Sequence, residues 1–125
     1  MKISEQITFI YTNDLERTSK FYGEILGFPL VHDQGTCRIY KSTDKSYIGF
    51  CQKDIEILAS HVILTFVTDD VDKYYEKLKE AEVDIVKKPQ NNPEFNIYHL
   101  FCHDPNGYLV EIQRFNDPDW NKLER

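Results

Sequence analysis

The first half of the chain alternates between strand-like and helix-like patterns of apolar residues. The segment Ile7–Thr12 is rich in β-branched and aromatic residues, which predicts a strand. In the segment that follows, Asn13 or Asp14 can cap a helix, and Gly27 suits a left-handed residue at its end. The apolar residues between these ends fall near one helical face: Leu15, Phe21, Tyr22, Ile25 and Leu26. Turn-rich segments then separate three predicted strands: Phe28–His32, Cys37–Lys41 and Tyr47–Gln52.

The second half repeats this order of elements. The segment His61–Thr68 predicts a strand. A capped helix follows, with these apolar residues on its buried face: Val71, Tyr74, Tyr75, Leu78 and Ala81. A short strand from Val83 is expected to stop at Pro89, before a loop over 90–95. Two final strands form a predicted hairpin around an Asn106–Gly107 turn: Asn96–Cys102 and Tyr108–Phe115.

The two halves can be aligned on each other through a strand and a helix. Ile7 aligns with Ile63, and Asp14 aligns with Asp70. This register predicts an internal duplication of a βαβββ unit. Because each unit is too small to bury its own sheet face, we expect one domain over residues 1–125 with a shared core. Its expected parts are a first module over about 5–53, a second over about 60–115, and a C-terminal tail over 116–125.

Composition narrows the class of protein and its partners. The chain has 125 residues, including eight Tyr and eight Phe, and its formal net charge is −6. This composition is globular, and the acidic balance makes nucleic acid an unexpected partner, whereas a neutral or cationic small molecule is easier to accommodate. The N-terminus lacks the apolar core of a signal peptide, and no apolar run approaches the length of a membrane span. We therefore expect a cytoplasmic protein with no membrane partner.

Three cysteines occur, at positions 37, 51 and 102, with no CxxC or CxxH grouping. The odd number and the spacing predict reduced, part-buried thiols. The strand residues Cys102 and His103 point to opposite faces, so this histidine is badly placed to activate the thiol. No nucleophile elbow and no glycine-rich phosphate loop occurs in the sequence.

Three segments carry a family resemblance: NDLERTSKFYGEILGF over 13–28, TDDVDKYYEKL over 68–78, and HDPNGYLVEI over 103–112. With the paired units, they make the chain similar to the vicinal oxygen chelate superfamily, the group of glyoxalases, bleomycin resistance proteins and extradiol dioxygenases. The resemblance implies an α+β fold in which two βαβββ modules form a cupped, eight-stranded mixed sheet with helices outside and a ligand inside. It also implies a homodimer.

The resemblance further implies where a divalent metal would be held in the metal-dependent members. The corresponding positions in this sequence are Ile7, Ile63, Gly49 or Phe50, and Glu111. Only Glu111 offers a donor, and one carboxylate cannot hold a metal alone. We therefore expect no cofactor. A divalent metal held by Glu111 and His61 is the alternative, since His61 is expected on the same strand face as Ile63.

The sequence therefore predicts a metal-free protein of the glyoxalase/bleomycin-resistance type that sequesters a drug or metabolite in an aromatic cup. Glu111 stands in an apolar strand, where an ionised carboxylate is costly unless it meets a tyrosine hydroxyl, a lysine, water or a cationic ligand. The strand register leaves the facing of Tyr40, Tyr47 and Phe50 open. The candidate ligand-binding residues are Phe9, Tyr11, Tyr40, Tyr47, Phe50, Thr65, Glu111 and Gln113.

The alternative function is a metal-dependent lyase of the glyoxalase type, or a dioxygenase, that uses Glu111 and His61. A third reading is a metal-independent enzyme with Glu111 as a base. His99 and His103 share a face of their predicted strand but are too far apart to bind one metal easily. In the tail, Trp120 and Leu123 either cover a neighbouring surface or pack on their own domain as a short helix.

Overall fold

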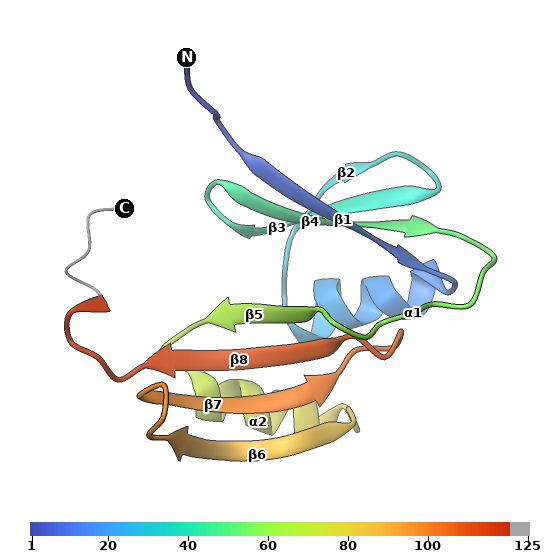
Figure 1. Cartoon of the computed structure of the whole chain (residues 1–125). Helices are drawn as coiled ribbons and strands as arrows, with labels where there is room; N and C mark the ends of the chain where they lie inside the picture. Colours follow the sequence, from blue (N-terminus) through green and yellow to red (C-terminus); the bar gives the residue numbers. More distant parts are fainter. Residues whose placement is uncertain (121–125) are drawn as a thin grey trace. The chain divides into compact units, whose positions relative to one another are not determined.

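Each half of the chain folds into its own four-stranded mixed sheet in the computed structural model, which describes residues 1–120 (Figure 1). The first unit comprises Met1–Leu58 together with the turn Pro105–Gly107, and the second comprises Ala59–Asp104 and the chain from Tyr108. The strand orders, β1-β4-β3-β2 and β5-β8-β7-β6, are the same in both units. This equivalence confirms the predicted α+β fold built from two βαβββ modules.

The sheet of the first unit contains one parallel and two antiparallel pairs of strands. Its elements are β1 (Gln6–Thr12), α1 (Leu15–Ser19), η1 (Lys20–Ile25), β2 (Leu30–Asp33), β3 (Cys37–Thr43) and β4 (Ser46–Gln52). Strand β1 runs parallel to β4, while β3 pairs antiparallel with both β4 and β2. The parallel pair requires a long connection, which the helix and the two intervening strands supply.

The predicted helix begins and ends where its capping residues indicate. The Asp14 carboxylate accepts a hydrogen bond from the backbone N–H of Arg17 at 3.1 Å, so Asp14 is the N-cap. Gly27 has φ +80°, the left-handed conformation that closes a helix. The interior differs from the expectation, because the α-helix continues as the π-helical segment η1 from Lys20.

The core of the first unit lies between this helix and one face of its sheet. The Tyr22 and Phe50 rings have centroids 4.3 Å apart, and both side chains are fully buried. At the helix N-terminus, the buried hydroxyls of Thr12 and Thr18 lie 2.9 Å apart. The Asn106 amide joins them, because its Oδ1 accepts from Thr12 and its Nδ2 donates to Thr18. This network explains how the Pro105–Gly107 turn belongs to the first unit.

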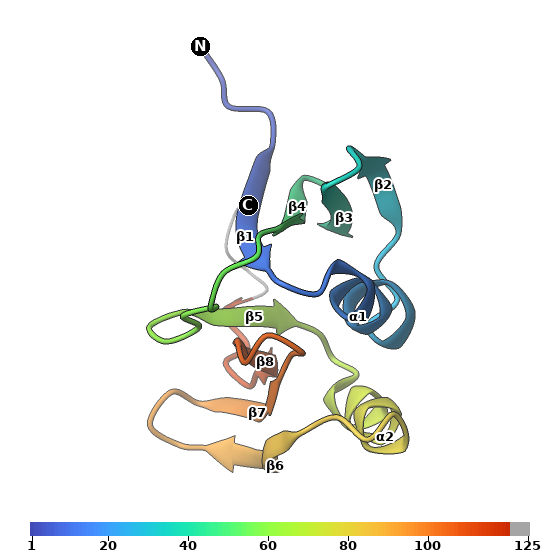
Figure 2. The same cartoon turned by 90° about the vertical axis from the view of Figure 1, so that its right-hand side faces the viewer.

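The second unit also packs its helix against one face of its sheet. Its elements are β5 (Ile63–Val67), α2 (Val71–Glu80), β6 (Ile85–Asn92), β7 (Ile97–His103) and β8 (Leu109–Phe115). Helix α2 contacts β6, β7 and β8 and lies to one side of this sheet (Figure 2). Val71 and Leu78 on α2 are buried, as are the alternate strand residues that include Leu100, Val110 and Ile112.

Strand β6 is longer than its sequence predicts. It continues through Pro89 to Asn92, so part of the expected loop over 90–95 is strand. The physical reason is the position of β6 at the edge of the sheet, where a residue without an N–H removes no essential ladder bond. The pairing with β7 also shifts register between Lys87 and Gln90, which accommodates the proline.

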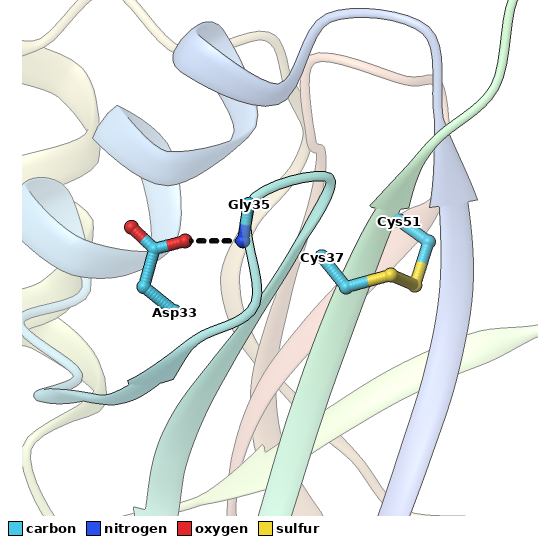
Figure 3. The surroundings of a disulfide bond; sticks show 4 residues. All are labelled: Asp33, Gly35, Cys37 and Cys51. Carbon is cyan, nitrogen blue, oxygen red and sulfur yellow. Dashed lines mark hydrogen bonds between the residues drawn. A yellow bond between two sulfur atoms is a disulfide. The ribbon is translucent and has the colours of Figure 1, made fainter.

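Two of the three cysteines form a disulfide, which corrects the expectation of reduced thiols. Cys37 on β3 and Cys51 on β4 are directly opposite in the antiparallel ladder, with Cα atoms 4.1 Å apart (Figure 3). The preceding turn is held by the Gly35 N–H, which donates to the Asp33 carboxylate at 2.8 Å. The sequence spacing could not reveal this pair, because only the strand register brings the residues together. Cys102 is a free, buried thiol.

Residues 1–120 have two further features, one in the helices and one in the tail. None of the helices in this part of the chain is long and apolar enough to span a membrane. In the tail, Trp120 stacks on Phe115 with ring centroids 3.9 Å apart, so it packs on its own unit. Leu123, its predicted apolar companion, lies outside the described residues.

Candidate functional site

Glu111 is held by two side chains from the strands on either side of β8. Its Oε1 accepts a hydrogen bond from the Thr65 hydroxyl on β5 at 2.9 Å. Its Oε2 lies 2.7 Å from Nδ1 of His99 on β7, and an ionised carboxylate can only accept, so Nδ1 donates. Glu111 is 9% exposed. The protein partners are therefore a threonine and a histidine, neither of which was among the tyrosine hydroxyl, lysine, water or cationic ligand expected from the sequence.

His99 is the residue that the sequence interpretation missed. It is 2% exposed, and its second ring nitrogen, Nε2, is buried with no hydrogen-bond partner within residues 1–120. Phe101 contacts the ring edge-on, with centroids 5.0 Å apart. The hairpin turn in the sequence could have indicated the contact between His99 and Glu111. The turn fixes the register in which Phe101 faces Glu111 and His99 faces Gln113. His99 is then a diagonal neighbour of Glu111 on one sheet face.

The two histidines of β7 have separate carboxylate partners. His103 Nδ1 lies 2.8 Å from the Asp84 carboxylate in an exposed pair, whereas His99 pairs with Glu111. The two histidines therefore contact different carboxylates, Glu111 and Asp84.

The sheet face around Glu111 is apolar and open along β5. Ile63 and Val67 are each more than half exposed, at 54% and 53%. They flank Thr65 on the same face, because strand side chains alternate. Gln113, the register partner of both Val67 and His99, adds a nearly buried amide to this face. The face therefore combines exposed hydrocarbon with a carboxylate, an imidazole and an amide.

The first unit presents an aromatic face on β1. Ile7, Phe9 and Tyr11 alternate on one side of the strand, and Phe9 is 48% exposed. The ring of Phe9 covers Gly49, its register partner on β4. Tyr47 shares this face and donates a hydrogen bond to Glu5, which raises the pKa of its phenol. The Cys37–Cys51 disulfide lies on the same face, since Cys51 is the register partner of Tyr11.

Two of the predicted lining residues lie on the other face of this sheet. Phe50 is fully buried against Tyr22 in the core, so it does not join Phe9 and Tyr11. Tyr40 is also nearly buried on the helix side. There it lines a cleft of about 410 Å³ whose other residues include Glu16, Glu24, Phe28 and Leu30. The Glu16 carboxylate at this cleft is bound to Arg38 at 2.7 Å.

The donor set does not fit a divalent metal centre of the kind that the resemblance implies. Ile7 and Ile63 offer hydrocarbon, and Gly49 offers no side chain. His61 lies in a turn with φ +70° before β5 begins, so it does not share the strand face of Ile63 as expected. Within residues 1–120, no three His, Cys, Asp or Glu side chains lie together in a metal-binding group. Glu111 and His99 contact each other, but two such side chains are fewer than the three protein ligands that a metal site of this kind uses.

The remaining thiol is also a poor nucleophile. Burial of Cys102 raises the pKa of its thiol to about 12, and the charges of Asp104 and Asp84 add to this effect. At neutral pH the thiol is therefore protonated. As the register partner of Val110, Cys102 also lies on the opposite sheet face from Glu111 and His99.

Comparisons with known proteins cover nearly the whole chain. The family model described as the Glyoxalase/Bleomycin resistance protein/Dioxygenase superfamily matches residues 5–112. The uncharacterized protein YraH of Bacillus subtilis (strain 168) is 29% identical in an alignment of 119 positions that covers 84% of this chain and 93% of the relative. A crystal structure of a glyoxalase/dioxygenase from Nostoc punctiforme superposes with a TM-score of 0.78 at 16% identity, covering 89% of this chain and 90% of that one. The crystal structure of a lactoylglutathione lyase from Agrobacterium tumefaciens superposes with a TM-score of 0.70 at 20% identity, covering 86% of this chain and 90% of that one.

Proposed function

Because the chain belongs to the Glyoxalase/Bleomycin resistance protein/Dioxygenase superfamily, we propose that it is a small-molecule-binding protein that sequesters a drug or metabolite without a metal ion. The observation that supports this most directly is the donor set. Ile7, Ile63 and Gly49 stand at the positions where the resemblance implies metal ligands, and the Phe9 ring covers Gly49. Hydrocarbon and an aromatic ring at these positions favour apolar ligand contact over coordination.

The ligand chemistry follows from the two sheet faces. The exposed aromatic residues Phe9 and Tyr11 suit a flat apolar body. In the second unit, the Glu111 carboxylate, on a chain of net charge −6, suits a cationic group of a ligand. Thr65 and Gln113 complete the small set of polar groups that orient a ligand. We therefore propose a flat, cationic aromatic compound as the ligand class.

Assembly and location are further parts of the proposal. We propose a homodimer, which light scattering on the purified chain would test. The cytoplasmic location stays a prediction. The disulfide between Cys37 and Cys51 argues against it, because disulfides are uncommon in a reducing compartment.

The test is a binding titration combined with elemental analysis of the purified chain. Metal-free bleomycin and proflavine, a flat cationic acridine, are titrated with and without a chelator. We expect saturable binding that the chelator leaves unchanged and no stoichiometric divalent metal. Glu111→Gln, which removes the charge but keeps the shape, is expected to weaken proflavine binding, whereas Glu94→Gln on an exposed turn is the matched control.

Two results would overturn the proposal. One is a stoichiometric divalent metal whose removal abolishes turnover of the adduct between a 2-oxoaldehyde and a thiol. The other is the absence of saturable binding of both bleomycin and proflavine.

A further inference from the structure

We propose that Nε2 of His99 is the hydrogen-bond acceptor for a donor group of the bound small molecule, and that Glu111 orients the imidazole ring for this contact. The inference rests on the proposed function and specifies the ligand. It assigns to the ligand an N–H or O–H donor on its flat body, in addition to the positive charge that Glu111 attracts.

The geometry indicates which nitrogen of His99 bonds to Glu111. The carboxylate of Glu111 accepts from Nδ1 at 2.7 Å, and the Thr65 hydroxyl holds the other carboxylate oxygen at 2.9 Å. In a neutral imidazole with its proton on Nδ1, Nε2 has a free lone pair. Glu111 therefore holds the tautomer and the direction of the ring, as carboxylates do for histidines that act through their other nitrogen.

The unpaired atom is the observation that points to a ligand. Nε2 is buried and has no partner within residues 1–120, whereas most buried polar atoms of folded proteins are hydrogen-bonded. Leaving such an atom unpaired destabilises a fold, and burying the His99–Glu111 pair adds a desolvation penalty. A pair kept for stability alone would gain from a partner at Nε2. Its absence within the described chain indicates that the partner arrives with a ligand.

The surrounding face supports a small organic molecule in this role. Ile63 and Val67 expose hydrocarbon along β5, on the open side of Glu111. Gln113, the register partner of His99 on β8, is nearly buried and brings an amide that can donate or accept. Apolar surface around a few convergent polar groups is the usual composition of a small-molecule site. One imidazole nitrogen and one carboxylate already bonded to each other do not make a metal site.

The test compares two dyes and two matched histidine variants. Proflavine carries two exocyclic amino groups, whereas acridine orange is the same flat cation with those groups fully methylated. His99→Asn keeps a donor near the position of Nδ1 and removes Nε2. His103→Asn makes the same change on the same strand, at an exposed histidine paired with Asp84.

We expect wild type to bind proflavine more tightly than acridine orange. His99→Asn should weaken proflavine binding roughly tenfold, the effect of one hydrogen bond, and change acridine orange binding by less than about twofold. His103→Asn should leave both affinities unchanged. In the ¹⁵N spectrum of wild type, Nε2 of His99 should be unprotonated and should shift when proflavine is added.

A second variant separates ligand binding from folding. In His99→Leu/Glu111→Leu the buried pair is replaced by hydrocarbon, which is often neutral or stabilising for a fold. We expect a melting temperature equal to or above that of wild type, together with loss of proflavine binding. A lower melting temperature with equal losses for both dyes in His99→Asn would assign the pair a structural role and overturn the inference.

The outcomes also separate the inference from the proposed function. If His99→Asn binds both dyes as wild type does, the inference is wrong while the binding function stands. If wild type binds neither dye nor bleomycin, the proposed function fails, and the inference fails with it.

Discussion

The ring of Phe9 lies over Gly49, its register partner across β1 and β4. A Cβ atom at position 49 would lie 2.5 Å from both Cδ1 and Cε1 of that ring, well inside van der Waals contact. In the duplicated unit, the residue equivalent to Gly49 is Glu111, because Thr65 aligns with Phe9 and pairs with Glu111. In the first unit this position has no side chain and the Phe9 ring covers it, whereas in the second unit the residue at this position carries a carboxylate.

Gly49→Ala is expected to lower stability by about 1 to 2 kcal/mol, because the new methyl group displaces the Phe9 ring. Urea unfolding measures the loss. The control is Phe9→Ala, in whose background the same alanine should have little further effect. Equal losses from Gly49→Ala in both backgrounds would mean that the Phe9 ring is not responsible.

Glu111→Leu alone is expected to destabilise the chain by about 3 kcal/mol or more, since it leaves the buried His99 ring without its carboxylate partner. Combining it with His99→Leu should recover that loss in full. Thermal and urea unfolding of the two single variants and the double variant give the coupling between the residues. Additive losses would contradict a direct pair.

Removal of the disulfide by Cys37→Ser/Cys51→Ser is expected to cost about 3 kcal/mol, because the bond closes a loop of sequence separation 14 in the unfolded chain. Thiol titration in denaturant should find one free thiol in the untreated protein and three after reduction, as the sequence has three cysteines. Three free thiols without reduction would contradict the bond.

Cys102 should resist alkylation at pH 9 in the folded chain, because burial raises the pKa of its thiol to about 12. In the unfolded chain this thiol ionises near its ordinary value of 9.0, so the unfolded state loses its proton first. The stability contributed by the protonated thiol is present below pH 9 and declines as pH rises toward 12. Iodoacetamide labelling and urea unfolding at pH 7 to 10 measure both effects, and Cys102→Ala should lack this part of the decline. Rapid labelling of folded protein at pH 8 would argue against a buried thiol.

Local sequence determined much of the fold. The duplicated strand and helix patterns, the Asp14 cap, the left-handed Gly27 and the Asn106–Gly107 turn all act over a few residues, and each is found where the pattern predicts it. The presence of Glu111 on an apolar strand was likewise readable, because alternation assigns residues to a face without reference to distant segments.

Tertiary structure decided which side chains lie on each face of the two sheets. Which side of the sheet holds Phe50 and Tyr47 depends on the register between strands far apart in the chain, and a shift of one residue would exchange them. The same register places Cys37 opposite Cys51 and His99 beside Glu111. It also puts Pro89 on an edge strand, where a proline can be tolerated. These relationships are non-local pairings, so the sequence supplied the residues and only the folded sheets decided which of them meet.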